Sequence, residues 1–298
     1  MCYLKVALIA ALALAAAPGP AQRGSAAPGA PPDHPFAQPL WDDGRAEVSV
    51  YGGTTLRYGQ LRPTTAHLIV VKEDLLRESL VKSDSGPVPG RTLTAIKYNF
   101  IADFPTGTYT YHQMATVMFD RRDLTVLKET MSHTEGCGIT FVRIGPRHGA
   151  WMHEAHSYWE GEADRAVAVE WPEGPRAFAD ALPVWLRGWT RAGAPAEFRL
   201  WMMPAQVSGR SPVAATRPIE ARITGSDGGT VRVPAGAFPS RVFRVVTAAG
   251  TDTLWFDANA PHVMLKMATA AGRRLELRKT RRLDYWKHTQ NGDERLLE

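Results

Sequence analysis

The sequence predicts a mainly β protein: an antiparallel curved sheet, a half-open barrel or a sandwich, with a short helical insertion. Apolar and polar residues alternate over many short segments, as expected of strands with one buried and one solvated face. Helical spacing of apolar residues is confined to residues 175–191. The sequence lacks the regular alternation of strands and helices that builds a parallel α/β sheet. Hydrophobic residues make up 44% of the chain and charged residues 22%, which is ordinary for a globular protein.

The first 21 residues have the pattern of a secretory signal peptide. Lys5 precedes an apolar run over residues 6–17, which is shorter than the roughly 20 apolar residues needed to span a bilayer. Small residues follow, with Gly19 and Ala21 at the spacing that a signal peptidase accepts. We therefore expect cleavage after Ala21 and an exported protein, either periplasmic or secreted. A retained membrane anchor is the alternative.

Residues 22–39 are rich in Pro and Ala and show no periodicity, which predicts a disordered tether. Residues 40–298 then form the β-rich domain. Residues 204–218 are rich in Ser, Gly, Pro and Ala, and leave open a division of this domain into two sub-domains near that point. The sequence leaves the oligomeric state open.

The first predicted strands follow Asp43-Gly44, a dipeptide typical of turns. They are residues 46–51, 55–60, 65–72 and 93–104. The stretch Gly107–Gly161 continues as a meander, in which Tyr111, Ala115, Val117 and Phe119 share one face of a strand. Further strands are predicted at residues 125–133, 139–144, 150–159 and 164–171. We expect this stretch to form the central part of the sheet.

Residues 175–191 place Phe178, Leu182, Trp185 and Trp189 on one face of a helix. Pro183 predicts two short helices, with the second beginning at that residue. Asp227-Gly228-Gly229 predicts a hairpin turn between two strands. The strands predicted in this half of the chain are residues 197–203, 219–225, 230–234, 241–248, 252–257, 262–269 and 274–280.

Several short motifs resemble those of uncharacterised exported bacterial proteins with a periplasmic β-rich domain of unknown function. They are Trp41-Asp42-Asp43-Gly44-Arg45-Ala46-Glu47, Arg57-Tyr58-Gly59, Lys72-Glu73-Asp74, Thr106-Gly107-Thr108-Tyr109, Glu135-Gly136-Cys137-Gly138, Leu254-Trp255-Phe256-Asp257, Pro261-His262 and Asp284-Tyr285-Trp286. Such domains are distantly similar to lipoprotein-carrier folds, which are curved sheets that wrap an apolar ligand. The resemblance implies a fold and a compartment, and assigns no activity.

His153 and His156 raise the question of a metal site, because their spacing is close to that of a helical zinc-protease motif. On the predicted strand, however, an offset of three residues places the two imidazoles on opposite faces. A zinc site needs three or four converging ligands. We therefore predict no metal site, with His112, His133 and His148 as the remaining candidates for cross-strand partners.

Cys137 is the only cysteine of the exported chain, so no intramolecular disulfide can form. A catalytic cysteine needs a neighbouring base and a lowered pKa. Gly136 and Gly138 are explained by a tight connection between strands. The alternative is a hydrolase that uses Cys137 or His and Glu residues of the stretch 107–161. Glu154, Glu160 and Glu162 lie close together in the sequence, but a pair of nearby carboxylates is only a weak signal for glycosidase chemistry. We predict no catalytic residue and, on balance, a protein without enzymatic activity.

The charge pattern argues against nucleic-acid binding. The net charge is +5, but acidic residues are interspersed throughout and no basic block resembles a nucleic-acid footprint. The basic residues 278–282 leave open a weak association with an envelope surface. The glycine-rich residues 225–229 precede a strand, so no helix N-terminus is available for a phosphate. We predict no cofactor.

The most suggestive feature is a cluster of aromatic residues and methionines around the helical insertion. A short apolar helix in a curved open sheet can plug or gate a cavity for an apolar ligand. Packing in a closed core is the alternative. We expect binding of an apolar small molecule, such as a lipid or an acyl chain. A structural envelope protein without a small ligand is the remaining alternative. The predicted ligand-binding residues are Trp185, Trp189, Trp201 and Met203, with Met202 beside them.

Overall fold

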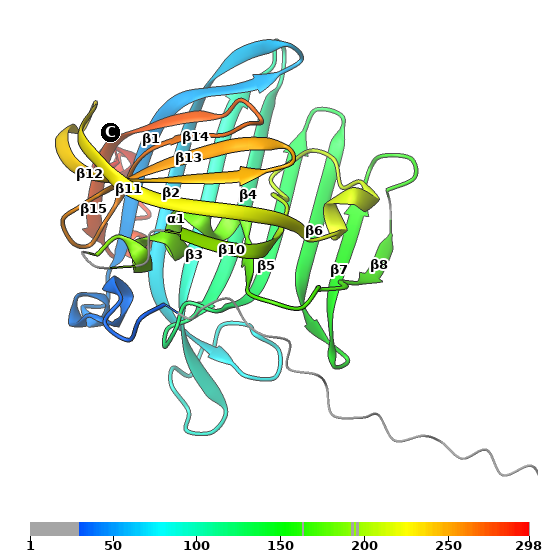
Figure 1. Ribbon diagram of the computed structural model, residues 1–298, viewed down its shortest axis with the longest axis horizontal. Helices are drawn as coiled ribbons and strands as arrows, with labels where there is room; N and C mark the ends of the chain where they lie inside the picture. The colour runs from blue at the N-terminus through cyan, green and yellow to red at the C-terminus, as the bar shows by residue number, and fades with distance from the viewer. Residues whose placement is uncertain (1–29, 163, 192–193, 195–196, 298) are drawn as a thin grey trace, which may run out of the picture.

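The computed structural model describes residues 30–162, 164–191, 194 and 197–297. Fifteen strands lie side by side in one sheet (Figure 1), in the order β8-β7-β6-β5-β4-β3-β2-β1-β15-β14-β13-β12-β11-β10-β9. The first eight are β1 (Ala46–Arg57), β2 (Gln60–Leu76), β3 (Thr92–Pro105), β4 (Thr110–Asp120), β5 (Val126–Glu135), β6 (Gly138–Arg147), β7 (Ala150–Ser157) and β8 (Arg165–Ala168). The others are β9 (Arg176–Phe178), β10 (Glu197–Met203), β11 (Ile219–Val233), β12 (Gly236–Thr247), β13 (Gly250–Asp257), β14 (Met264–Ala268) and β15 (Arg274–Leu283).

The sheet consists of two meanders. In the first, β1 to β8, each strand pairs with the next along the chain, and the same holds for β9 to β15. The pairing of β1 with β15 joins the two meanders and aligns Val48 with Arg281. Neighbouring strands are antiparallel except β9 and β10, which run parallel. The predicted antiparallel sheet is therefore confirmed.

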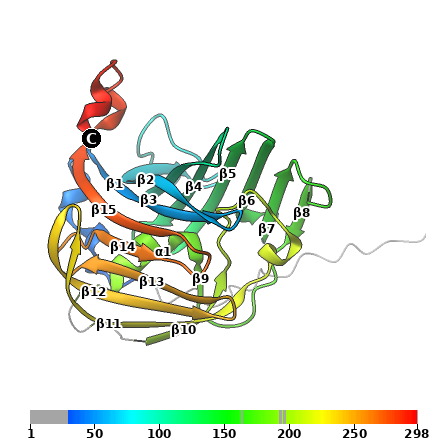
Figure 2. The ribbon, with the colours of Figure 1, turned by 90° about the horizontal axis from the view of Figure 1, so that it is seen from above.

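The sheet curls strongly, and its concave side faces the helical segment (Figure 2). Its two end strands, β8 and β9, do not pair with each other, so hydrogen-bonded strands do not close the curl. Residues 169–175 connect these end strands along the chain. The predicted fold class, a mainly β protein with a curved, half-open sheet and a short helical insertion, is confirmed.

The alternation of residues in β4 shows why this stretch forms a strand. Tyr111, Ala115, Val117 and Phe119 are all buried, and their common face is the one predicted from the sequence. Thr110 and His112 point to the other side and are exposed. The meander Gly107–Gly161 therefore supplies strands β4 to β7 of the sheet.

The helical insertion is a single run of residues 179–189. It begins with a 3-10 turn (Ala179–Ala181), continues as α1 (Leu182–Trp185) and ends in a second 3-10 turn (Leu186–Trp189). The prediction of two helices separated at Pro183 is wrong. This proline stands in the first turn of α1, where its missing N–H breaks no hydrogen bond, and the preceding residues pair as β9 instead. No helix in the described part of the chain is long and apolar enough to cross a membrane.

The hydrophobic core fills the concave side of the sheet. One cluster joins Val70 and Ile96 of the first meander, Phe243 of the second, and Leu186 of the helical segment. Both meanders therefore share a single core. The burial of apolar surface across this core is the main source of stability that the fold offers.

The predicted tether of residues 22–39 is wrong in its last ten residues. His34 and Phe36 are fully buried, and Pro35–Ala37 forms a 3-10 turn. Phe36 packs against Trp41, with ring centroids 4.8 Å apart, and His34 Nε2 lies 3.0 Å from the carbonyl oxygen of Arg121. Aromatic burial thus outweighs the low order expected from the Pro-rich composition. The signal peptide and residues 22–29 lie outside the described residues.

Two further boundaries differ from the predictions. Residues 204–218 do not separate sub-domains, because β10 and β11 on either side of them pair directly. The change from one meander to the other lies at residues 169–175 instead. Asp227-Gly228-Gly229 is a bulge inside the long strand β11, not a hairpin turn, and this strand turns back at residues 234–235. The extra residue of the bulge lets the strand bend and continue.

A buried ion pair attaches the helical segment to β1. The two terminal nitrogens of the Arg187 guanidinium donate to the two carboxylate oxygens of Glu47, at 2.8 and 3.0 Å. The side chains are 3% and 5% exposed, and Arg187 also donates to the carbonyl oxygen of Pro261 at 2.6 Å. Two parallel bonds of this kind fix the position of the helical segment as well as neutralising the charges.

We expect the substitution Arg187→Met to lower the free energy of unfolding by about 3–5 kcal/mol, because it leaves the buried Glu47 carboxylate without its partner. Urea denaturation provides the measurement. As a matched control, Arg222→Met removes the cation from an exposed pair with Glu197 and should cost less than about 1 kcal/mol. Equal costs for the two variants would contradict the role given to the buried pair.

Candidate functional site

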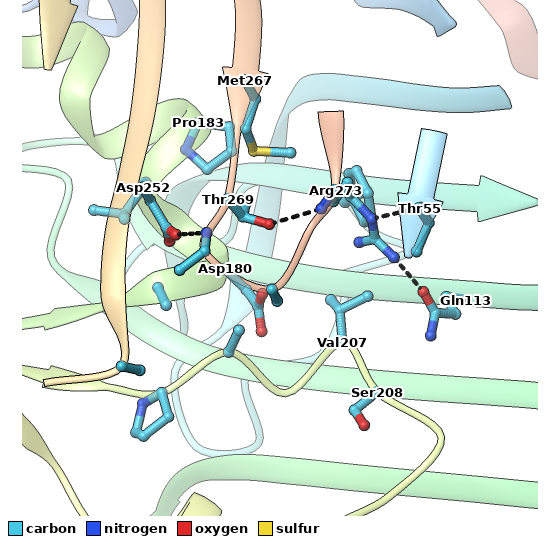
Figure 3. A pocket seen from close by; sticks show the side chains of 18 of the residues that line it. Thr55, Gln113, Asp180, Pro183, Val207, Ser208, Asp252, Met267, Thr269 and Arg273 are labelled. Carbon is cyan, nitrogen blue, oxygen red and sulfur yellow. Dashed lines mark hydrogen bonds between the residues drawn. The ribbon is translucent and has the colours of Figure 1, made fainter. Parts of the chain in front are cut away.

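A cavity of about 440 Å³ opens on the concave side of the sheet (Figure 3). Its volume falls within the range of about 300–1,000 Å³ that is usual for small-molecule sites. Both meanders contribute to its wall, as do the helical segment and the connection between β10 and β11. The apolar residues of the wall are Leu56, Phe100, Phe104, Ala179, Leu182, Pro183, Met202, Pro204, Ala205, Val207, Ile219, Ala249, Leu254, Met267, Ala270 and Ala271.

The helical segment supplies part of this wall. Ala179, Leu182 and Pro183 face the cavity, while the later residues of the segment pack into the core. The strand positions of the wall follow from strand periodicity, since Leu254 and Met267 are directly opposite each other in β13 and β14. The helical segment therefore borders the cavity, and the expectation that it plugs or gates a cavity for an apolar ligand stays a prediction.

Arg273 is the cation set most deeply in the cavity wall. Its Nε donates to Thr55 Oγ1 at 3.2 Å and one terminal nitrogen donates to Gln113 Oε1 at 2.6 Å (Figure 3). The guanidinium lies over the ring of Phe100, 5.1 Å from its centroid. Burial lowers the pKa of Arg273 to about 10, so the side chain remains charged at neutral pH.

The carboxyl of Asp180, in the helical segment, lies near that of Glu129 of β5; Glu129 is fully buried and Asp180 is partly buried. Burial raises the pKa of Glu129 well above its usual value, and the proximity of Asp180 adds to this effect. Burial also raises the pKa of Asp180, but the backbone N–H of Gln206 donates to its carboxylate at 2.5 Å and works in the opposite direction. Glu129 is therefore the member of the pair that holds the proton.

Gln206 connects Asp180 to the buried His153. Its Oε1 lies 3.0 Å from His153 Nε2, and its Nε2 donates to the carbonyl oxygens of Pro204 and Ala215 at 2.7 and 3.0 Å. Because the amide oxygen can only accept, His153 Nε2 carries the proton, and Nδ1 is left as an acceptor with no partner among the described residues. Burial lowers the pKa of His153, so its ring is neutral.

The loop of residues 204–211 crosses from β10 to the far end of the first meander. The carbonyl oxygen of Gly209 accepts hydrogen bonds from Thr140 of β6 at 3.0 Å and from the Trp159 indole at 2.7 Å. Ser211 donates its backbone N–H to the buried Glu162 at 2.8 Å, and its carbonyl oxygen accepts from Arg165 of β8 at 2.7 Å. These bonds hold together the two ends of the curl, which strand pairing leaves open.

His133 of β5 lies where this loop meets the cavity wall. Its ring packs on that of Tyr111, with centroids 4.9 Å apart, and its Nδ1 lies 3.3 Å from Gln113 Nε2. Burial lowers the pKa of His133 to about 4, so the ring is neutral at pH 7. A Cβ atom on Gly209 would lie 2.8 Å from His133 Nε2, so a glycine is required at this point of the loop.

The structure places the four predicted ligand-binding residues outside the wall of the main cavity. Trp189 and Met203 are buried in the core, and Trp185 borders a separate cavity of about 120 Å³ together with Trp151, Trp171 and Phe178. Trp201 is half-buried, lines a separate and more open hollow of about 500 Å³ together with Arg199 and Arg222, and donates from its indole to the carbonyl oxygen of Glu173 at 3.1 Å. Met202, the neighbour of Trp201 on the other face of β10, does line the cavity. A role of the four residues in binding stays a prediction.

The histidines and the cysteine of the first meander do not converge. His153 is buried, whereas His156 is exposed and lies 2.8 Å from Asp164, so the prediction of opposite faces is confirmed. Cys137 is exposed, and the pKa of its thiol is raised by partial desolvation and by Glu135, the opposite of what a nucleophile needs. Within the described residues, no group of three or more His, Cys, Asp or Glu side chains could hold a metal ion.

Sequence reasoning missed the polar groups of the cavity, above all Arg273, Asp180 and Gln113. Arg273 stands in a run of charged residues that is typical of a solvated edge. Gln113 takes an inward position in β4, and a polar residue on an otherwise apolar face is the signal that could have identified it. Asp180 lies opposite the predicted apolar stripe of the helical insertion, where a polar residue is ordinary, so the pattern gave no signal for it.

Comparisons with known proteins add a likeness in fold. No protein-family model and no curated protein matches the chain. Among solved structures, it is similar to a beta-barrel-like protein. That crystal structure is of the domain of unknown function DUF1849 from Brucella abortus; identity is 9%, the TM-score is 0.48, and the match covers 80% of this chain and 98% of the other. The resemblance to exported proteins with a periplasmic β-rich domain stays a prediction.

We expect Glu129→Gln to remove part of the pH dependence of stability. In the folded protein Glu129 stays protonated well above pH 4.5, whereas in the unfolded chain it ionises above that pH. The folded state therefore binds more protons in this range, and its stability falls as pH rises, by up to about 1.4 kcal/mol per pH unit for one group.

Urea denaturation between pH 5 and pH 8 measures this effect. The variant should gain stability relative to the unsubstituted protein as pH rises, because Gln cannot ionise. Glu220→Gln, at an exposed position of β11, is the matched control and should leave the slope unchanged. A constant difference between Glu129→Gln and the unsubstituted protein across this range would contradict the protonation assigned to Glu129.

Proposed function

We propose that this is an exported, periplasmic or secreted, binding protein for an apolar small molecule such as a lipid or an acyl chain, held in the cavity of about 440 Å³. The observation that supports this most directly is the cavity itself. It is walled largely by apolar side chains from both meanders and from the helical segment, and binding sites for small molecules share this character.

The position of the cavity supports the same proposal. A well-packed core contains few voids larger than a water molecule. A cavity of this size among apolar side chains loses packing contacts that a filled core would keep. An apolar ligand would restore these contacts and remove its own surface from water, at about 25 cal/mol for each Å² buried.

The alternatives receive less support. A structural envelope protein without a ligand has no need of a cavity inside its sheet. A hydrolase that uses Cys137 would require an activated thiol, and this thiol is exposed, with a raised pKa. The export and the compartment rest on the N-terminal pattern of residues 1–21.

We expect Val207→Trp to abolish or strongly weaken ligand uptake, since Val207 lines the cavity and a larger ring would occupy its space. Displacement of a fluorescent fatty acid, together with native mass spectrometry of the protein without its first 21 residues, measures the binding. Val213→Trp makes the same change at an exposed position in the same connection, away from the cavity wall, and should bind as the unsubstituted protein does.

Unchanged binding in Val207→Trp would place the ligand elsewhere. Protein that is ligand-free after purification and takes up neither fatty acid nor fluorescent lipid would overturn the proposed function. It would favour the structural role instead.

A further inference from the structure

The cavity wall contains two guanidinium groups that are held by neutral partners. Arg273 donates to Thr55 and Gln113. Arg57 donates through Nε and a terminal nitrogen to the Tyr111 hydroxyl at 3.3 and 3.0 Å, and to the Tyr58 hydroxyl at 3.4 Å. Neither forms an ion pair with a carboxylate among the residues that the structure describes. Arg187, which the core encloses, differs in having Glu47 as its counter-charge.

The two arginines occupy the same part of the wall. Thr55 and Arg57 are two residues apart in β1, so their side chains leave the same face of the strand. Gln113 and Tyr111, which accept from Arg273 and Arg57, are related in the same way in β4. The side chains of Thr55 and Arg57 in β1 and of Tyr111 and Gln113 in β4 all line the cavity. Because Arg273 bonds to Thr55 and Gln113, and Arg57 bonds to Tyr111, the two arginines lie on the same side of the wall.

Uncharged aromatic rings hold the guanidinium groups of Arg57 and Arg273 in position. The guanidinium of Arg57 lies 4.4 and 5.1 Å from the ring centroids of Tyr58 and Tyr111. Arg273 lies over Phe100. Ring faces and neutral hydrogen-bond acceptors orient a guanidinium while leaving its full charge available to an anion.

The acidic groups of the cavity are engaged by backbone N–H donors. Asp252 accepts from Ala270 at 2.7 Å, and Asp180 accepts from Gln206 at 2.5 Å. Figure 3 shows Asp252 at one end of the cavity and the group formed by Thr55, Gln113 and Arg273 at the other. An anion beside Arg273 would thus lie apart from the Asp252 carboxylate. Asp180 stands between the two ends; it forms no salt bridge with Arg273, but its carboxylate is near enough to attract the guanidinium.

We propose that the ligand is a single-chain amphiphile with an oxyanion head group, a carboxylate or a phosphate ester, and that Arg273 and Arg57 bind this head group. The inference rests on the proposed function. A guanidinium presents parallel N–H donors that match the oxygens of a carboxylate or phosphate. The chain would lie along Phe100, Leu254 and Met267. A charge beside unpaired guanidinium groups would then be neutralised inside a largely apolar site.

The test compares three ligands of equal chain length: palmitate, hexadecyl phosphate and hexadecanol. Isothermal titration of the protein without its first 21 residues should show that palmitate or hexadecyl phosphate binds at least about tenfold more tightly than hexadecanol, because only the anions form charge-assisted bonds. The stronger of the two anions identifies the head group.

Arg273→Met should remove this preference and leave the affinity for hexadecanol within about twofold. Arg274→Met, at the exposed neighbouring position in β15, is the matched control and should keep the preference. If Arg273→Met fails to fold, Arg57→Met replaces it and should reduce the preference in the same direction. Retained hexadecanol binding shows that a variant is folded.

Equal binding of all three ligands by the unsubstituted protein would overturn the head-group inference and leave the proposed function intact. So would an unchanged preference in both Arg273→Met and Arg57→Met. Binding of none of the three ligands would overturn the proposed function itself.

Discussion

The fold depends on contacts that hold the two ends of the curled sheet together, because its end strands do not pair with each other. β8 and β9 leave the curl open, and residues 204–211 cross to the first meander and bond there. Most of these bonds join a side chain to a backbone group, and the buried Glu162 carboxylate anchors one of them. The loop therefore replaces a strand ladder by a few specific contacts. The cavity exists because this closure holds the two halves of the wall at a distance instead of pairing them.

The same loop links the polar groups around the cavity. Gln206 contacts both Asp180 and His153, and Gly209 lies against His133. Both histidines have lowered pKa values through burial, and both have a ring nitrogen without a partner. Because the unfolded chain protonates histidines near pH 6.5 and the folded protein does not, stability is lost as pH falls below that value. Two neutral histidines therefore lie against the loop that closes the sheet, one bonded to Gln206 and one beside Gly209.

The sequence was sufficient for the fold class because strand periodicity is local. Residues 110–120 alternate so regularly that their buried face could be assigned from the pattern alone. Other features depend on contacts between distant segments. The burial of Phe36 requires Trp41, the bulge at Gly228 requires the partner strand β12, and Arg273 becomes a cavity residue only when β15 lies beside β1. The tryptophans of the helical insertion pack into the core on the concave side of the sheet. The cavity lies beside them, at Leu182 and Pro183.

The joining of β1 to β15 also has a consequence for the way the chain folds. Every other neighbouring pair of strands is consecutive in the chain, so most of each meander can grow by antiparallel neighbours. The parallel pair β9–β10, which is joined through the helical segment, is the exception. The β1–β15 pair instead brings together residues such as Val48 and Arg281 from opposite ends of the domain. The entropy of closing so long a loop rises only slowly with its length, by about 0.6 kcal/mol for each doubling. Contacts of this range nevertheless slow the search for the native arrangement. The β1–β15 pairing is therefore the strand pairing of this sheet that requires the longest-range search during folding.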